Sequence, residues 1–91
     1  MQISEFQQLI LDKYGSRDRK RGTSTTFMWF VEEVGELATA LAESESTTLS
    51  QKESEFADVF AWLCTLANIN DVDIDKACRD KYDGNEVTGY K

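Results

Sequence analysis

Four carboxylates stand in two equally spaced pairs in the middle of the sequence. Glu33 and Glu36 are three residues apart, and so are Glu55 and Asp58. In an α-helix such residues lie on one flank, about 60° apart around the axis, so each pair can share a ligand. Carboxylate oxygens without histidine or thiolate suit a hard divalent cation, magnesium or manganese. These four residues are therefore candidate ligands of a metal ion.

The charge balance around these acids supports the same hypothesis. Residues 23–75 contain eleven acidic side chains and a single cation, Lys52. Two carboxylates about 4 Å apart repel each other by about 1 kcal/mol in water and about 4 kcal/mol at an effective dielectric constant of 20. Shared protons or a metal ion would relieve this repulsion. The alternative for any single glutamate is the solvated face of an amphipathic helix.

Two helices are expected to carry the carboxylate pairs. Apolar residues recur at helical spacing over residues 25–43 and 49–68, and the polar segment between them predicts a short turn. In an antiparallel hairpin, the residue numbers of two residues that face each other add up to the same sum all along the hairpin. Three pairs share that sum: Trp29 with Trp62, Glu33 with Asp58, and Glu36 with Glu55. The hairpin would bring the carboxylates together beside two tryptophans, which either stack on a base and wall a pocket or belong to the core.

Two further helices are predicted on either side of this hairpin. Apolar spacing indicates one helix over residues 3–14, with Ser4 as its N-cap, and another over 74–82, capped by Asp73. The segment 15–25 holds four cations between two glycines and is predicted to be an exposed loop. Residues 86–91 form a tail without periodicity. We expect one all-α domain over residues 1–91, a four-helix-type bundle completed by oligomerisation.

Composition and charge narrow the partners. The 91 residues include no proline and carry a net charge of −7, so a nucleic-acid duplex or an anionic membrane surface would be repelled. No apolar run approaches the roughly 18 residues of a membrane span, and the first residues lack the pattern of a secretory signal. A cytoplasmic location is expected. Cys64 and Cys78 lie within apolar helical patterns and are predicted to be buried.

Three segments, in order, resemble the MazG-like, all-α nucleotide pyrophosphohydrolases. They are "WFVEEVGELATAL", "ESEFADVFAWL" and "DIDKACRDKYDGN". The first two contain Glu32-Glu33-x-x-Glu36 and Glu55-x-x-Asp58, which resemble the magnesium-binding signature of that family. The third resembles its lysine-then-asparagine segment, with Lys81 and Asn85. The resemblance covers most of the chain.

The resemblance implies an activity and a set of roles. The reaction would be magnesium-dependent hydrolysis of a nucleoside triphosphate between the α and β phosphates, giving the monophosphate and pyrophosphate, with manganese as a substitute metal. Glu32 would orient or deprotonate the attacking water, and the four paired carboxylates would bind the metal. Lys81 and Asn85 would bind phosphate or sugar, and Arg21 is the cation of the basic segment best placed to assist. Homo-oligomers, dimers or tetramers, are implied as well.

Two other functions are compatible with the same residues. One is a non-catalytic helical module whose acidic face binds a basic protein or a structural cation. The other, within the enzyme class, is a phosphoribosyl-ATP pyrophosphohydrolase. A panel of substrates would distinguish all three, whereas the preferred base and sugar do not follow from the sequence.

Overall fold

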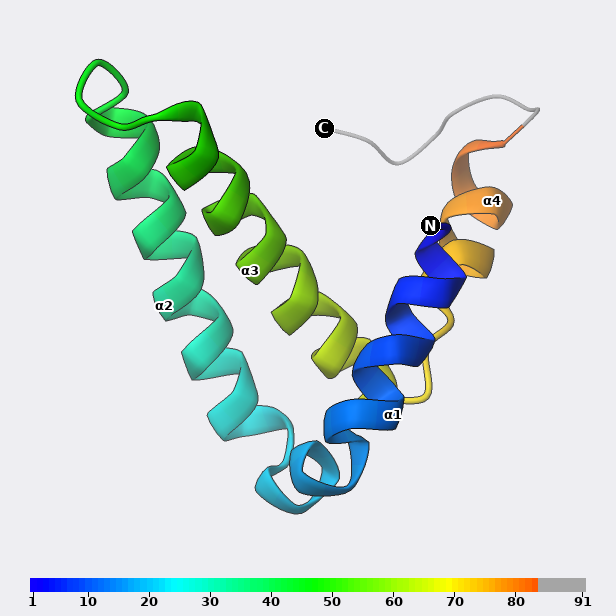
Figure 1. The fold of residues 1–91 in the computed structure, drawn as a ribbon. Coiled ribbons are helices and arrows are strands. Elements are labelled where there is room, and N and C mark those ends of the chain that lie inside the picture. The colour runs from blue at the N-terminus through cyan, green and yellow to red at the C-terminus, as the bar shows by residue number, and fades with distance from the viewer. Residues whose placement is uncertain (84–91) are drawn as a thin grey trace.

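The computed structural model describes residues 1–83 as four helices without a strand (Figure 1). The helices are α1 (Ile3–Arg21), α2 (Thr23–Ala42), α3 (Leu49–Ile69) and α4 (Ile74–Tyr82). The all-α prediction is therefore confirmed for the described part of the chain. Asn85 and the predicted tail 86–91 lie outside the described residues.

The predicted hairpin corresponds to α2 and α3, which run side by side along most of their length (Figure 1). The turn between them ends at Thr48, whose hydroxyl accepts a hydrogen bond from the backbone N–H of Gln51. The Gln51 side chain in turn accepts one from the Thr48 backbone N–H. This reciprocal capping box satisfies two backbone donors at the start of α3. It fixes where α3 begins and thereby the level at which its acids face α2.

Helix α1 is longer than predicted. The segment 15–21, expected to be part of an exposed loop, continues α1 to Arg21, and only Gly22 separates α1 from α2. Its charged residues are compatible with a helix, and the cations of the last turn oppose the negative end of the helix dipole. The predicted N-cap is also wrong: Gln2, not Ser4, precedes α1 and forms a capping box with Glu5.

A small core joins α1 to α3. Ile10, Cys64 and Ala67 are its buried apolar residues within 1–83, and Phe6 stacks on Phe60 with ring centroids 5.5 Å apart. Burial raises the pKa of the Cys64 thiol to about 11, because removal from water disfavours the thiolate. Cys64 is thus an inert core residue, as expected.

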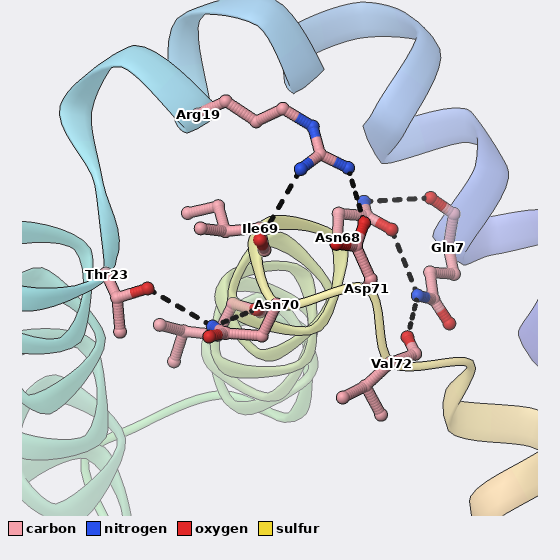
Figure 2. A network of polar contacts seen from close by, with 9 residues as sticks. Gln7, Arg19, Thr23, Asn68, Ile69, Asn70, Asp71 and Val72 are labelled. Carbon is pink, nitrogen blue, oxygen red and sulfur yellow. Dashed lines mark hydrogen bonds and ion pairs between the residues drawn. The ribbon is translucent and has the colours of Figure 1, made fainter.

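Buried amides hold the turn between α3 and α4 against α1 (Figure 2). The Gln7 amide nitrogen donates to the side-chain oxygen of Asn68 at 3.0 Å and to the carbonyl of Val72 at 2.7 Å. Asn68 donates back to the Gln7 carbonyl, and the Gln7 side-chain oxygen accepts from the backbone N–H of Ile74. Because buried amides are costly when unpaired, this network fixes the path of the chain into α4.

Exposed contacts tie the same turn to the α1–α2 junction. Arg19 donates to the carboxylate of Asp71 at 3.0 Å, and Asn70 donates to the hydroxyl of Thr23 (Figure 2). Asp73 caps α4 as predicted, by accepting from the backbone N–H of Lys76. The C-terminal end of α3 is therefore anchored to the end of α1 and to the start of α2.

The four helices form an open V and not a closed bundle (Figure 1). Helices α2 and α3 make one arm, while the N-terminal part of α1 and α4 make the other. The Cα radius of gyration is 14.8 Å, against about 12 Å for a compact domain of this length. Cys78, predicted to be buried, is exposed on α4, whose main contacts within residues 1–83 are with α1. Among residues 1–83, no helix has both the length and the apolar character to cross a bilayer.

Candidate active site

Carboxylates from the two helices of the hairpin meet across their interface. One carboxylate oxygen from each of Glu33, Glu55 and Asp58 lies within 4.8 Å of the other two. Glu36 is not part of this tight group, but it is close enough to Glu33 to contribute to the raised pKa of Glu33. We call these four residues the carboxylate cluster. The i, i+3 spacing on each helix and the antiparallel pairing of α2 with α3 bring them together.

The surroundings of the cluster leave its negative charge without a protein counterion. Within residues 1–83, no member of the cluster takes part in an ion pair. Oxygen atoms Oε2 of Glu33 and Oε2 of Glu55 are buried and have no hydrogen-bond partner. Burial and the interactions with Glu36, Asp58 and Glu55 raise the pKa of Glu33 to about 7. Unpaired buried carboxylate oxygens this close together fit a hard divalent cation, which prefers oxygen ligands.

An indole pair borders the cluster at one end. Trp29 lies one helical turn before Glu33, and Trp62 one turn after Asp58. Their ring centroids are 5.7 Å apart in an edge-to-face arrangement, so the pairing expected from the hairpin is present. The Trp29 residue remains 42% exposed. It therefore combines a structural contact with a surface that a ligand can reach.

Arg21 lies against the indole pair. Its guanidinium carbon is 4.8 Å from the ring centroid of Trp29 and 5.2 Å from that of Trp62. Its Nη2 donates to the Asp18 carboxylate at 2.8 Å, and its Nε donates to the hydroxyl of Thr26 at 2.9 Å. The side chain is only 13% exposed. Arg21 is consequently fixed by the protein, whereas the sequence predicted that it would lie in an exposed loop.

Two of these partners were not singled out from the sequence. Asp18 and Thr26 are both buried, with 3% and 0% of their surface exposed. A signal was available for Asp18, because it stands three residues before Arg21, the spacing of an ion pair on one helix face. Nothing in the sequence places Thr26 next to Arg21, since that contact crosses the sharp junction between α1 and α2.

The remaining candidate residues are dispersed. Glu32 is exposed on α2, one turn before Glu36 on the same side of the helix. Lys81 is exposed at the end of α4, on the opposite arm of the V from the carboxylate cluster, with its ammonium 5.5 Å from the Tyr82 ring centroid. The structure thus does not bring Lys81 to the cluster of its own chain. The position of Asn85 is outside the described residues.

Comparison with known proteins agrees with the chemistry of the cluster. Residues 21–83 match the sequence profile of the family described as the MazG nucleotide pyrophosphohydrolase domain. No curated protein matches the chain. The matched segment contains α2, α3, α4 and every member of the carboxylate cluster. Because it spans more than half of the chain, the protein belongs to the family of MazG nucleotide pyrophosphohydrolase domains.

Proposed function

We propose that this protein is a magnesium-dependent pyrophosphohydrolase of nucleoside triphosphates, which it cleaves between the α and β phosphates. Family membership supports a nucleotide pyrophosphohydrolase. The observation that carries the metal dependence is the carboxylate cluster, with two buried oxygens that have neither a hydrogen bond nor a counterion in residues 1–83. The products are the nucleoside monophosphate and pyrophosphate.

The carboxylate cluster is the proposed metal site. Glu33, Glu55 and Asp58 would hold the ion, with Glu36 as the fourth ligand beside Glu33. Magnesium supplies charge neutralisation at the phosphates, orientation of the substrate and a lower pKa of water. Manganese, which also prefers oxygen ligands, is the expected substitute.

Glu32 is the proposed general base. It is exposed, lies on the same side of α2 as Glu36 and belongs to no ion pair among residues 1–83. Its carboxylate is therefore free to orient a water molecule and to accept its proton as the phosphoanhydride bond breaks. The chemistry requires no covalent protein nucleophile and no histidine.

We further propose that the working enzyme is a homo-oligomer, a dimer or a tetramer. Helix α2 has a row of apolar residues that are between 40% and 53% exposed: Phe27, Val31, Val34 and Leu41. Their spacing of four, three and seven residues places them on one face, suited to packing against another helix. Because Lys81 lies away from the cluster of its own chain, any contact of Lys81 with the phosphates would have to come from a second copy (Figure 1).

A substrate panel tests the proposed reaction. Purified protein with magnesium should release pyrophosphate from at least one nucleoside triphosphate. Activity confined to phosphoribosyl-ATP would assign the histidine-pathway reaction instead. A folded protein that releases no pyrophosphate from any substrate, and that triphosphates with magnesium do not protect against heat, would be a non-catalytic module.

A matched pair of variants tests the metal site. Glu36→Gln should lower kcat/KM by at least about 100-fold, since even the outer partners of metal ligands alter affinity or activity 10- to 100-fold. Glu53→Gln, an exposed acid on α3 outside the cluster, should retain activity. Equal activity of the two variants, with unchanged circular dichroism, would refute the assignment of Glu36.

A further inference from the structure

A cavity of about 400 Å³ lies at the junction of α1 and α2, next to the indole pair. It is lined by Arg17, Lys20, Arg21 and Trp29. We call it the basic cavity. Trp29 and Glu33 are one turn apart on the same flank of α2, so the basic cavity adjoins the carboxylate cluster at its tryptophan end. A nucleotide with its phosphates at the cluster therefore has this cavity within reach of its base.

The walls of the basic cavity suit a flat ring. Trp29 supplies an indole that remains 42% exposed, and the aliphatic stems of Arg17 and Lys20 add further apolar surface. Stacking of a nucleobase on an aromatic side chain contributes substantially to binding without selecting a particular base. The walls explain how a base could be held, but any choice between bases must come from the polar groups.

Those polar groups are all donors. Arginine, lysine and the indole N–H carry hydrogen-bond donors and no acceptor. Arg17 and Lys20 form no ion pair within residues 1–83, and Arg17 stacks on Tyr14 with its guanidinium carbon 5.0 Å from the ring centroid. Arg21 uses Nε and Nη2 for Thr26 and Asp18, whereas its Nη1 makes no hydrogen bond to any described residue. These lining residues thus carry donors that are not used within residues 1–83.

A donor-only cavity distinguishes two kinds of base. Uracil, thymine and hypoxanthine present ring-carbonyl oxygens where cytosine and adenine present an amino group. An oxygen can accept from the cationic side chains, and such charge-assisted hydrogen bonds are the stronger kind. An amino group facing the same cations meets donors only, so both sides remain unpaired.

We propose that the basic cavity is the base-binding subsite and selects nucleotides whose base carries a carbonyl oxygen at C4 of a pyrimidine or C6 of a purine over those with an amino group at that position. This inference rests on the proposed function, whose substrate class it names. Arg17 and Lys20 are the specificity-determining residues, and Arg21 is held in place by Asp18 and Thr26 to complete the set of donors.

Matched pairs of substrates test this selectivity. UTP with CTP, and ITP with ATP, differ chiefly by an oxygen in place of an amino group. With magnesium present, kcat/KM should be at least tenfold higher for UTP than for CTP and for ITP than for ATP. In the double variant Arg17→Gln/Lys20→Gln these ratios should fall towards one, because a glutamine amide both donates and accepts. Lys13→Gln, an exposed α1 residue outside the cavity lining, should leave the ratios unchanged.

Binding measurements separate this inference from the proposed activity. Quenching of tryptophan fluorescence by UMP and CMP, and by IMP and AMP, reports binding beside Trp29 without turnover. Tighter binding of UMP and IMP that is lost in the double variant supports the inference even if no triphosphate is hydrolysed. Equal binding within each pair, or a preference for the amino bases, would overturn it.

Discussion

At the scale of single residues, Glu33 shows how the fold builds reactivity from ordinary side chains. The same carboxyl group at the surface would have a pKa near 4.5, whereas burial and three neighbouring acids raise its pKa to about 7. The protein thus stores electrostatic repulsion at the carboxylate cluster, and a divalent cation would relieve it. Perturbed acids of this kind are concentrated at functional sites.

This perturbation predicts how stability depends on pH in the absence of metal. Glu33 retains its proton up to a higher pH in the folded protein than in the unfolded chain. Its protonation therefore stabilises the folded state, and this contribution to the unfolding free energy is fully present below about pH 4.5. The contribution is lost as pH rises through about 7. Denaturation in urea with EDTA present should show a decrease in unfolding free energy across this window. Glu33→Gln should flatten the decrease, whereas Glu53→Gln should not.

Magnesium should reverse this trend. Because protons compete with the metal for carboxylate oxygens, the rise in melting temperature on adding magnesium should be larger at about pH 8 than at about pH 5. Differential scanning fluorimetry measures both values. Equal shifts at the two pH values, or an undiminished shift in Glu33→Gln, would contradict metal binding at the cluster.

At the scale of elements, the junction of α1 and α2 decides the environment of the indole pair. The two helices are separated by Gly22 alone, which has φ of 86° and ψ of 170°. This region of backbone space is essentially restricted to glycine. The abrupt change of direction brings Arg21, at the end of α1, onto Thr26 and Trp29 in the first turns of α2.

Gly22→Ala should therefore be destabilising. We expect a loss of about 1–3 kcal/mol in unfolding free energy, the usual cost of such a conformation for a residue with a side chain. The matched control is Gly35→Ala, where an added Cβ would meet no atom within 4 Å and the helical propensity improves by about 1 kcal/mol. Equilibrium urea denaturation compares the two, and equal stabilities would show that the junction tolerates other backbone conformations.

At the scale of the whole molecule, the open V leaves much apolar surface in water. Only three apolar residues within 1–83 are buried, while the row of Phe27, Val31, Val34 and Leu41 is largely exposed. Burial of an apolar side chain contributes about 1.5–3 kcal/mol, so covering this row is a substantial driving force for association. A Cβ added at Gly35 would meet no atom within 4 Å, so α2 is also open at this position in the single chain.

Association should accordingly be measurable and sensitive to this row. Multi-angle light scattering should give a multiple of the 10.4 kDa chain mass, and the melting temperature should rise with protein concentration. Val31→Glu should shift the mass towards that of one chain, because a carboxylate in an apolar interface is costly. Thr25→Glu, an exposed polar position in the first turn of α2 on the side away from this row, should have no such effect. A native chain that is monomeric at all concentrations would refute the oligomer.

The sequence by itself determined what depends on local periodicity. Apolar spacing placed α2, α3 and α4 within two residues of their observed ends, and the spacing of the acids indicated that Glu33, Glu36, Glu55 and Asp58 would meet. The structure places Glu33, Glu55 and Asp58 in one tight group and leaves Glu36 outside it. Both inferences require only the helical repeat and one short turn. The extension of α1 to Arg21 escaped prediction, because glycines and cations are typical of loops as well as of helix ends.

Contacts between segments that the helical repeat does not relate to one another were decided only by the tertiary structure. The burial of Asp18, the position of Arg21 over both indoles and the basic cavity depend on the single-residue junction at Gly22. The placement of α4 on α1, away from the carboxylate cluster, depends on the buried amides of Gln7 and Asn68. Such contacts form between residues distant in sequence or across a sharp turn, and their free energy comes from burial and hydrogen bonding that exist only once the helices have packed.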